Sequence, residues 1–279
     1  MKKFVIESVT KLDLICWMLV LSFFVGSAIL CGGSVELSFI GASGVVVVMF
    51  LVSVSIETII ETIKNVKGIG TIIGFITNGP EALCLLVLMW HGDVLLAAST
   101  PLGSNIMNPV LLICASFLCK KAIIVWQTNR MFSLICVGLT ATIAVCFYYI
   151  PESMYWVWWI VAVVVTGVLF RMRPREEEST DEEEAVAFSK WYLVPAVLLM
   201  LVAGYFLDPV VSFASVHSCA PKNLIGFLVL ATLTSWPEFK SCLVLLKRGM
   251  VLAAILNITV SNITNIWLAM LGVGFHLVS

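Results

Sequence analysis

Long apolar runs separated by short polar segments dominate this sequence and constrain its fold more than any other feature. Hydrophobic residues make up 61% of the 279 residues, and charged residues make up only 12%. Soluble proteins hold roughly 45–50% apolar and about 25% charged residues, so a water-soluble core of this size could not bury the apolar excess. A membrane-spanning helix needs about 20 mostly apolar residues. The sequence therefore predicts an all-α polytopic membrane protein.

Nine apolar runs are long enough to cross a bilayer. They lie at about 12–32, 38–63, 68–90, 94–118, 131–150, 154–170, 191–216, 223–246 and 249–275. Short cytoplasmic loops retain basic residues, and a cytoplasmic N-terminus places 14 of the 16 lysines and arginines on the inner side. A second interpretation takes the first run as a cleaved signal peptide, because lysines precede it. The charge distribution favours nine spans, with the N-terminus inside and the C-terminus outside.

The polar parts of the chain exclude several other classes of protein. The net charge is −1 and no basic patch is present, so nucleic acid is not expected as a partner. The nine cysteines form no CxxC pair, which argues against a zinc site or a disulfide framework. The segment 176–184 holds seven acidic residues and is typical of a solvated linker, with a regulatory calcium-binding loop as the alternative.

An internal repeat is the most informative motif. Residues 77–81 read TNGPE and residues 234–238 read TSWPE, while SNIMN at 104–108 is matched by SNITN at 261–265. The two segments of each matching pair are 157 positions apart, so a duplicated unit explains both pairs. By the span count, the two copies cross the membrane in opposite directions. Inverted repeats with broken helices are the architecture of secondary transporters, whose ion sites lie near the bilayer midplane.

The acidic residues of the repeat, Glu81 and Glu238, are the leading candidates for a functional site. A carboxylate inside a bilayer is costly unless it meets a cation or a partner. Each glutamate follows a proline, which removes a backbone donor and predicts a broken helix. The break should leave carbonyl oxygens free near Thr77 and Thr234.

The partner helices add further oxygen ligands. Ser104 with Asn108, and Ser261 with Asn265, are four residues apart and therefore share a helix face. Carboxylate, amide, hydroxyl and carbonyl oxygens suit calcium, with sodium at neighbouring positions, better than zinc or copper. The structural alternative is that these polar residues only hold membrane helices together.

At these residues the sequence resembles the cation/calcium exchanger superfamily, which includes the sodium/calcium exchangers. Its inverted alpha repeats carry a G-T-S-x-P-E-like stretch followed by a G-N-x-x-G-S-N-like stretch, and the resemblance covers about residues 36–120 and 190–276. It implies that Glu81 and Glu238 bind calcium, with backbone oxygens from Thr77 and Thr234. The remaining implied ligands of the calcium, sodium or proton sites are Asn78, Ser235, Ser104, Ser261, Asn108 and Asn265.

The resemblance also suggests a division of the chain. An extra N-terminal helix (1–35) precedes a first repeat (36–171, alpha-1 motif about 74–118), and an acidic cytoplasmic linker (172–190) leads to a second repeat (191–279, alpha-2 motif about 231–275). Because the family usually has ten helices, a second repeat that ends at Ser279 is expected to be truncated. Asn78 stands where the family favours Ser, and Asn265 where sodium/calcium exchangers often have Asp. These departures leave the coupling ion open.

We expect a secondary active antiporter that exchanges calcium for sodium or protons by alternating access, with no enzymatic activity and no permanently bound cofactor. The expected setting is a bacterial inner (plasma) membrane, with the lipid bilayer as a partner and the oligomeric state open. One alternative is a divalent-cation/proton exchanger that does not use sodium, and another is a degenerate, non-transporting scaffold. Lys240, two residues after Glu238, is expected to extend toward the inner surface, with an internal cation that replaces a coupling ion as the alternative.

Overall fold

The structure is a computed structural model that describes residues 9–90, 94–176, 189–220, 232–233 and 235–278, with only the backbone described for 94–100. Helices account for all the regular secondary structure of these residues, as predicted. They are α2 (Lys11–Cys31), α3 (Val35–Ile63), α4 (Ile69–Thr77), α5 (Gly79–Trp90), α6 (Val94–Leu118), α7 (Ala122–Gln127), α8 (Arg130–Tyr149), η1 (Glu152–Met154), α9 (Tyr155–Met172), η2 (Lys190–Tyr192), α10 (Leu193–Ser218), α12 (Trp236–Lys247) and α13 (Val251–Val278).

Eight helical segments of the described residues are long and apolar enough to cross a membrane. The chain is therefore an integral, multi-pass membrane protein. Eight of the nine predicted spans coincide with these segments. The ninth, at 223–246, lies partly outside the described residues, and its described end is α12. The short helix α7 was not predicted, because its six residues are too few to show a period of their own.

The prolines break the helices of both copies of the repeat at matching positions. In the first copy α4 ends at Thr77 and α5 begins at Gly79, with Pro80 in its first turn. In the second copy α12 begins at Trp236, so that Pro237 is again the second residue. A first-turn proline lacks only a donor that would have no helical partner there. Each break places a glutamate in the first turn of a new helix, at the positive end of its dipole.

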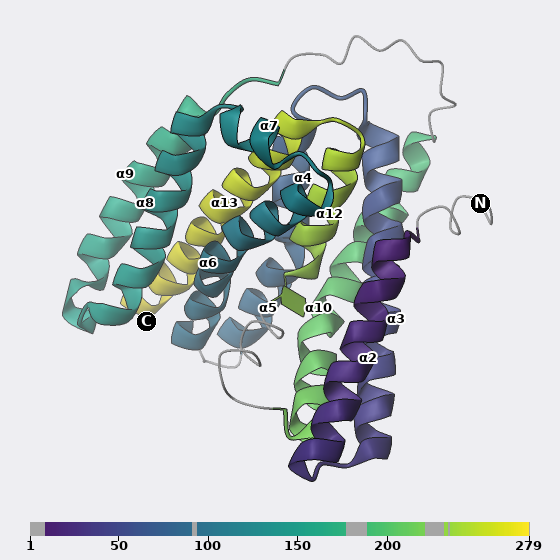
Figure 1. The fold of residues 1–279 in the computed structure, drawn as a ribbon. Helices are drawn as coiled ribbons and strands as arrows, with labels where there is room; N and C mark the ends of the chain where they lie inside the picture. The colour runs from purple at the N-terminus through teal and green to yellow at the C-terminus, as the bar shows by residue number, and fades with distance from the viewer. Residues whose placement is uncertain (1–8, 91–93, 177–188, 221–231, 234, 279) are drawn as a thin grey trace. The chain divides into compact units, whose positions relative to one another are not determined.

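One compact unit comprises residues 1–62 and 187–237, which include α2, most of α3, and α10. Close approach between α3 and α10 depends on Gly41, because a Cβ there would lie 2.9 Å from the Cα of Ala214. The amide of Ser34 donates a hydrogen bond of 2.9 Å to the carbonyl of His217 near the same end of these helices. The three helices lie side by side in Figure 1.

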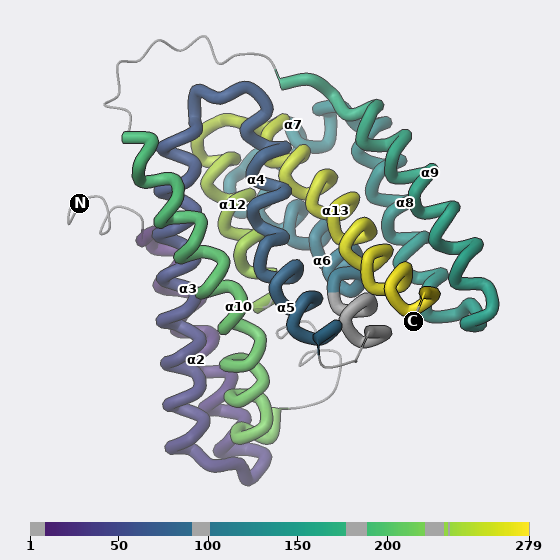
Figure 2. Tube along the Cα trace, turned by 180° about the vertical axis from the view of Figure 1, so that it is seen from behind, coloured from purple at the N-terminus to yellow at the C-terminus, as the bar shows by residue number. Residues whose placement is uncertain are grey.

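The second compact unit comprises residues 63–186 and 238–279. Its central element is α13, which packs most extensively against α6 and α4 and also contacts α8 and α9. Figure 2 shows α13 crossing between these helices. The contact with α4 is close at Gly74, where a Cβ would lie 2.7 Å from the carbonyl oxygen of Asn257. At Gly70 a Cβ would overlap the backbone of Ala253.

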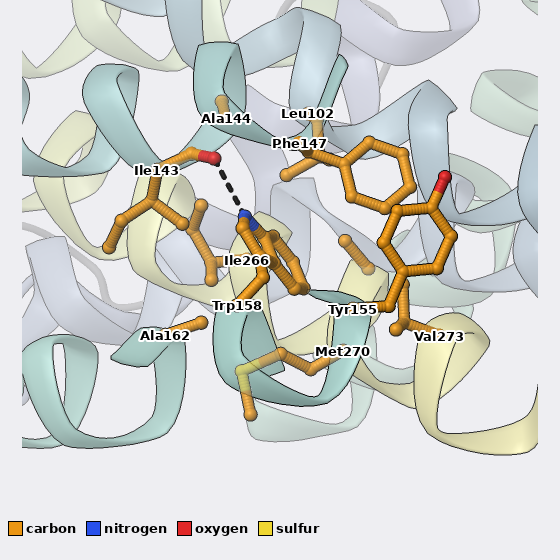
Figure 3. Close-up of a cluster of buried hydrophobic side chains, with 11 residues drawn as sticks. Leu102, Ile143, Ala144, Phe147, Tyr155, Trp158, Ala162, Ile266, Met270 and Val273 are labelled. Atoms are coloured by element: carbon orange, nitrogen blue, oxygen red, sulfur yellow. Dashed lines mark hydrogen bonds between the residues drawn. The ribbon is translucent and has the colours of Figure 1, made fainter. Parts of the chain in front are cut away.

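A cluster of aromatic and aliphatic side chains holds α13 against α8 and α9 (Figure 3). The indole nitrogen of Trp158 donates to the carbonyl oxygen of Ile143 at 2.9 Å, and the rings of Phe147 and Tyr155 stack with their centroids 5.2 Å apart. The indole of Trp159 donates to the carbonyl of Met270 at 3.0 Å. This packing fixes one part of α13, whose other turns carry the polar residues described next.

Candidate functional site

Equivalent asparagines of the two copies bond to each other at the contact between α6 and α13. The side-chain nitrogen of Asn105 donates to the carbonyl of Asn262 at 3.0 Å, and that of Asn262 donates to the carbonyl of Asn105 at 3.2 Å. The two residues are separated by 157 positions, which is the offset of the repeat. Because the bonds are reciprocal and α6 and α13 run in opposite directions (Figures 1 and 2), the inverted relation between the copies is visible in the geometry itself.

A second set of hydrogen bonds connects the first copy to Ser261 of the second. The amide of Asn78 donates to the carbonyl of Ser261 at 2.8 Å and accepts from its hydroxyl at 2.7 Å. The amide nitrogen of Asn108 also reaches Ser261, with 3.1 Å to the hydroxyl oxygen and 3.1 Å to the side-chain oxygen of Asn262. All four residues are buried. The helix break at Asn78 thus faces the middle of α13.

The two glutamates of the repeat belong to the same compact unit. Glu238 is fully buried, and Glu81 is half-buried with one of its oxygens enclosed. The two carboxylates lie within electrostatic reach of each other, and Glu238 lies beside the hydroxyl of Thr77. That hydroxyl faces Glu238 without completing a hydrogen bond. Two acidic side chains from opposite copies therefore lie in one compact unit, within electrostatic reach of each other.

Several buried polar atoms of this unit have no hydrogen-bond partner among the described residues. They are both carboxylate oxygens of Glu238, one carboxylate oxygen of Glu81, the hydroxyl of Thr77, the side-chain oxygens of Asn105, Asn108 and Asn257, and both polar atoms of the Asn265 side chain. An unpartnered buried acceptor costs roughly 1–3 kcal/mol, and more when it is charged. Most of these atoms are oxygens, which are the ligands that calcium and sodium require.

For the other predicted ligands, the structure gives only their burial and the compact unit to which they belong. Ser104 is half-buried on α6, and Ser235 is buried but belongs to the other compact unit. Thr234 lies outside the described residues. Lys240 is only 1% exposed, so its predicted extension to the inner surface is wrong. Its side chain is retained inside the protein two residues beyond Glu238.

Three residues of the polar network had no assigned role in the sequence prediction. Asn105 and Asn262 join the copies, and the amide of Asn262 also donates to the hydroxyl of Thr140 on α8 at 3.3 Å. The identity of Asn105 and Asn262 at one offset was a signal for this contact. Thr140 gave no signal, because a lone threonine in an apolar helix usually bonds to its own helix, as it also does here with Cys136.

The arrangement suits a hard cation held by oxygen atoms. Among the described residues, no group of three or more His, Cys, Asp and Glu side chains could hold a metal ion. Any cation here would therefore be bound by two carboxylates supplemented with amide, hydroxyl or carbonyl oxygens. Such a mixed oxygen set is typical of calcium, and its limited charge is compatible with reversible binding.

The fold and these residues define a membrane protein with inverted, proline-broken repeats and a buried carboxylate pair. Residues 189–278 match the profile of the family described as "Sodium/calcium exchanger protein". The chain is 28% identical over 223 residues to a protein of Alkalimonas amylolytica named "Putative antiporter CaxA", an alignment that covers 73% of this chain and 67% of that protein. No solved structure gives a significant match. The chain is therefore similar to sodium/calcium exchangers over its second repeat and, at low identity, to a protein named as an antiporter over most of its length.

Proposed function

We propose that this protein is a secondary active antiporter that moves calcium across a membrane in exchange for sodium or protons. The observation that carries the proposal is the carboxylate pair of Glu238, which is buried, and Glu81, which is half-buried, contributed by opposite copies of the repeat to one compact unit. Two negative charges neutralise one divalent cation. Without a cation or protons, the two charges would repel each other in a region that water cannot screen.

The neighbouring oxygens support a calcium ligand set around this pair. Thr77 ends α4 immediately before the break, and its hydroxyl faces Glu238. The side chains of Asn108 and Asn265 each hold a buried oxygen without a described partner. Calcium accepts six to eight oxygen ligands at flexible angles, so carboxylates supplemented with amide and main-chain oxygens fit its requirements.

The division of the chain into two compact units supports an alternating-access mechanism. Both glutamates belong to one unit, whereas the first long helix of each repeat, α3 or α10, belongs to the other. Transporters built from inverted repeats expose a fixed site to alternate sides by rocking one bundle against another. The same division is compatible with a non-transporting scaffold, which is the second candidate from another functional class.

Calcium uptake into proteoliposomes tests the proposal. We expect an outward sodium or proton gradient to drive uptake of calcium-45 by the wild-type protein. In Glu81→Gln and Glu238→Gln, uptake should fall by about 100-fold or more, because the bound calcium loses one of the two negative charges that neutralise it. Calcium-dependent thermal stabilisation in detergent should disappear in the same variants.

A matched substitution controls for a nonspecific loss of charge. Glu152 is exposed in η1, so Glu152→Gln should leave uptake within about twofold of the wild-type rate, since exposed substitutions have small effects. If wild-type protein of normal melting behaviour shows neither flux nor stabilisation by calcium, the scaffold interpretation replaces the antiporter.

A further inference from the structure

The side-chain amide of Asn78 forms two hydrogen bonds with Ser261. Its nitrogen donates to the main-chain carbonyl of Ser261 and its oxygen accepts from the hydroxyl of the same residue, at 2.8 and 2.7 Å. Asn78 is 2% exposed and Ser261 is fully buried. The two bonds form a closed pair between residues 183 positions apart, at the break between α4 and α5.

In this cluster, side-chain amide hydrogens point at the oxygen atoms that a monovalent metal ion would need as ligands. Sodium, like calcium, is bound by carbonyl and hydroxyl oxygens whose lone pairs face the ion. Here the carbonyl of Ser261 accepts from Asn78, and its hydroxyl oxygen accepts from Asn108 at 3.1 Å. Each amide hydrogen carries partial positive charge, so a sodium ion that uses the carbonyl of Ser261 would have to displace Asn78, and one that also uses the hydroxyl would have to displace Asn108.

The second copy of the repeat carries a different residue at the matching position. Ser235 stands 157 positions after Asn78, where its single hydroxyl can donate one hydrogen and offers no amide nitrogen. Asn265, the repeat equivalent of Asn108, has no hydrogen-bond partner among the described residues for either polar atom of its side chain. Among the described residues, the amide closure is therefore found in the first copy alone.

The carboxylates remain available when the Ser261 position is closed. Both oxygens of Glu238 and one of Glu81 have no partner among the described residues. Sodium needs several oxygens whose lone pairs face the ion. Given the proposed calcium antiport, we infer that Asn78 is a specificity-determining residue that excludes sodium from Ser261.

The first test measures sodium binding directly and does not depend on transport. Melting of the purified full-length protein in detergent is compared in sodium chloride and in choline chloride at equal ionic strength. We expect no sodium-specific stabilisation of the wild type. In Asn78→Ser, which places the residue of the second copy in the first, sodium should raise the melting temperature by several degrees. Equal sodium stabilisation of both proteins would overturn the inference.

Transport supplies the second test. At equal pH on both sides and with the membrane potential clamped, a sodium gradient should drive wild-type calcium-45 uptake less than about twofold above the choline control. In Asn78→Ser the same gradient should drive it at least fivefold above that control. Sodium-driven uptake by the wild type, or a folded Asn78→Ser that binds calcium yet gains no sodium response, would contradict the assignment.

A second variant keeps the test valid if Asn78→Ser does not fold. Asn78→Asp retains the shape and the acceptor of the side chain but removes its amide hydrogens. It should show the same sodium-specific stabilisation, and its failure to do so would also contradict the inference. Absence of calcium binding and flux in the wild type would instead reject the proposed antiport, while the sodium-melting comparison would still report on Asn78.

Discussion

The two copies of the repeat share most of their polar residues at matching positions, but the structure bonds them differently. In the first copy, the amides of Asn78 and Asn108 are directed into hydrogen bonds with α13. In the second copy, Asn265 has no partner among the described residues, and Glu238 is fully enclosed while Glu81 is only half-buried. Each copy supplies four of the oxygens in the second compact unit without a described partner, but only the second copy supplies a glutamate with both oxygens unpartnered and an asparagine side chain with no described hydrogen bond.

The central position of α13 explains this asymmetry. The partner helix of the second copy is packed against α6, α4, α8 and α9, whereas α6 of the first copy exposes several of its side chains. A helix that packs against several neighbours can form hydrogen bonds with each of them. The hydrogen-bond partners on these neighbours then determine which of its polar groups are satisfied. Repeat symmetry in sequence thus permits different roles for equivalent residues, and the following predictions test that difference.

The largest effect is expected where the first copy touches the second most closely. A methyl group at Gly70 would overlap the backbone of Ala253 on α13, so Gly70→Ala must separate α4 from α13. We expect a loss of about 3 kcal/mol, at the upper end of overpacking effects. Thermal melting of the purified protein measures this loss.

The same substitution at Gly103 of α6 is the matched control for Gly70→Ala. No atom lies within 4 Å of a Cβ placed there, so Gly103→Ala should melt at or slightly above the wild-type temperature. Equal melting of the two variants would mean that close packing of α4 on α13 does not hold the copies together.

Alanine substitutions of the equivalent asparagines Asn105 and Asn262 should differ in their cost to stability. Asn262 donates to Asn105 and Thr140 and accepts from Asn108, whereas the side chain of Asn105 makes one hydrogen bond to the described residues, to Asn262. We expect Asn262→Ala to cost about 2–3 kcal/mol and Asn105→Ala about 1 kcal/mol, because each buried group left without a partner adds its own desolvation cost.

A double-mutant cycle shows whether Asn105 and Asn262 act as one pair. Since each side chain bonds to the backbone of the other, the double alanine variant should be nearly additive, within about 0.5 kcal/mol. If Asn105→Ala proves the more damaging single change, then the second copy is not the central one, and the asymmetry described above is wrong.

The glutamates should differ in their tolerance of a shorter side chain. Glu81 is half-buried, whereas Glu238 is fully enclosed, so a shortened side chain leaves an unfilled space only at Glu238. We expect Glu238→Asp to weaken calcium binding about tenfold more than Glu81→Asp, a difference of about 1.4 kcal/mol. Calcium-dependent melting curves measure both affinities. A larger loss in Glu81→Asp would place the tighter calcium contact in the first copy.

The sequence predicted the membrane fold and the carboxylate pair but not the hydrogen-bond network between the copies. Apolar runs determine spans, and a proline before Glu81 or Glu238 determines where a helix breaks, so both follow from local chemistry. The partner of Asn78 is 183 residues away and depends on how closely α4 approaches α13. The separation between α4 and α13 is set by the packing of Gly70 and Gly74 on α13, and no local sequence pattern reveals this packing.

The smallest predicted effect concerns an anchor of the first copy at the start of α4. The carboxylate of Glu176 accepts hydrogen bonds from the amides of Gly70 at 3.0 Å and Thr71 at 3.3 Å, groups that begin a helix without internal partners. Burial raises the pKa of Glu176, while these two bonds and the nearby Arg173 guanidinium oppose the rise. Because the side chain is half-buried, we expect Glu176→Ala to cost only about 0.5–1 kcal/mol.

Hydrogen exchange at the amides of residues 69–72 measures this loss, with the exposed Glu152→Ala as the control. The raised pKa also fixes the sign of the pH dependence. The folded state binds the proton of Glu176 more tightly than the unfolded chain does, so stability decreases as pH rises from the ordinary pKa of 4.5 through the raised value. The advantage of the wild type over Glu176→Ala should therefore be larger at the acid end of that window. An advantage that grows with pH would show that the hydrogen bonds and Arg173 outweigh burial, and that the ionised carboxylate is the form that anchors α4.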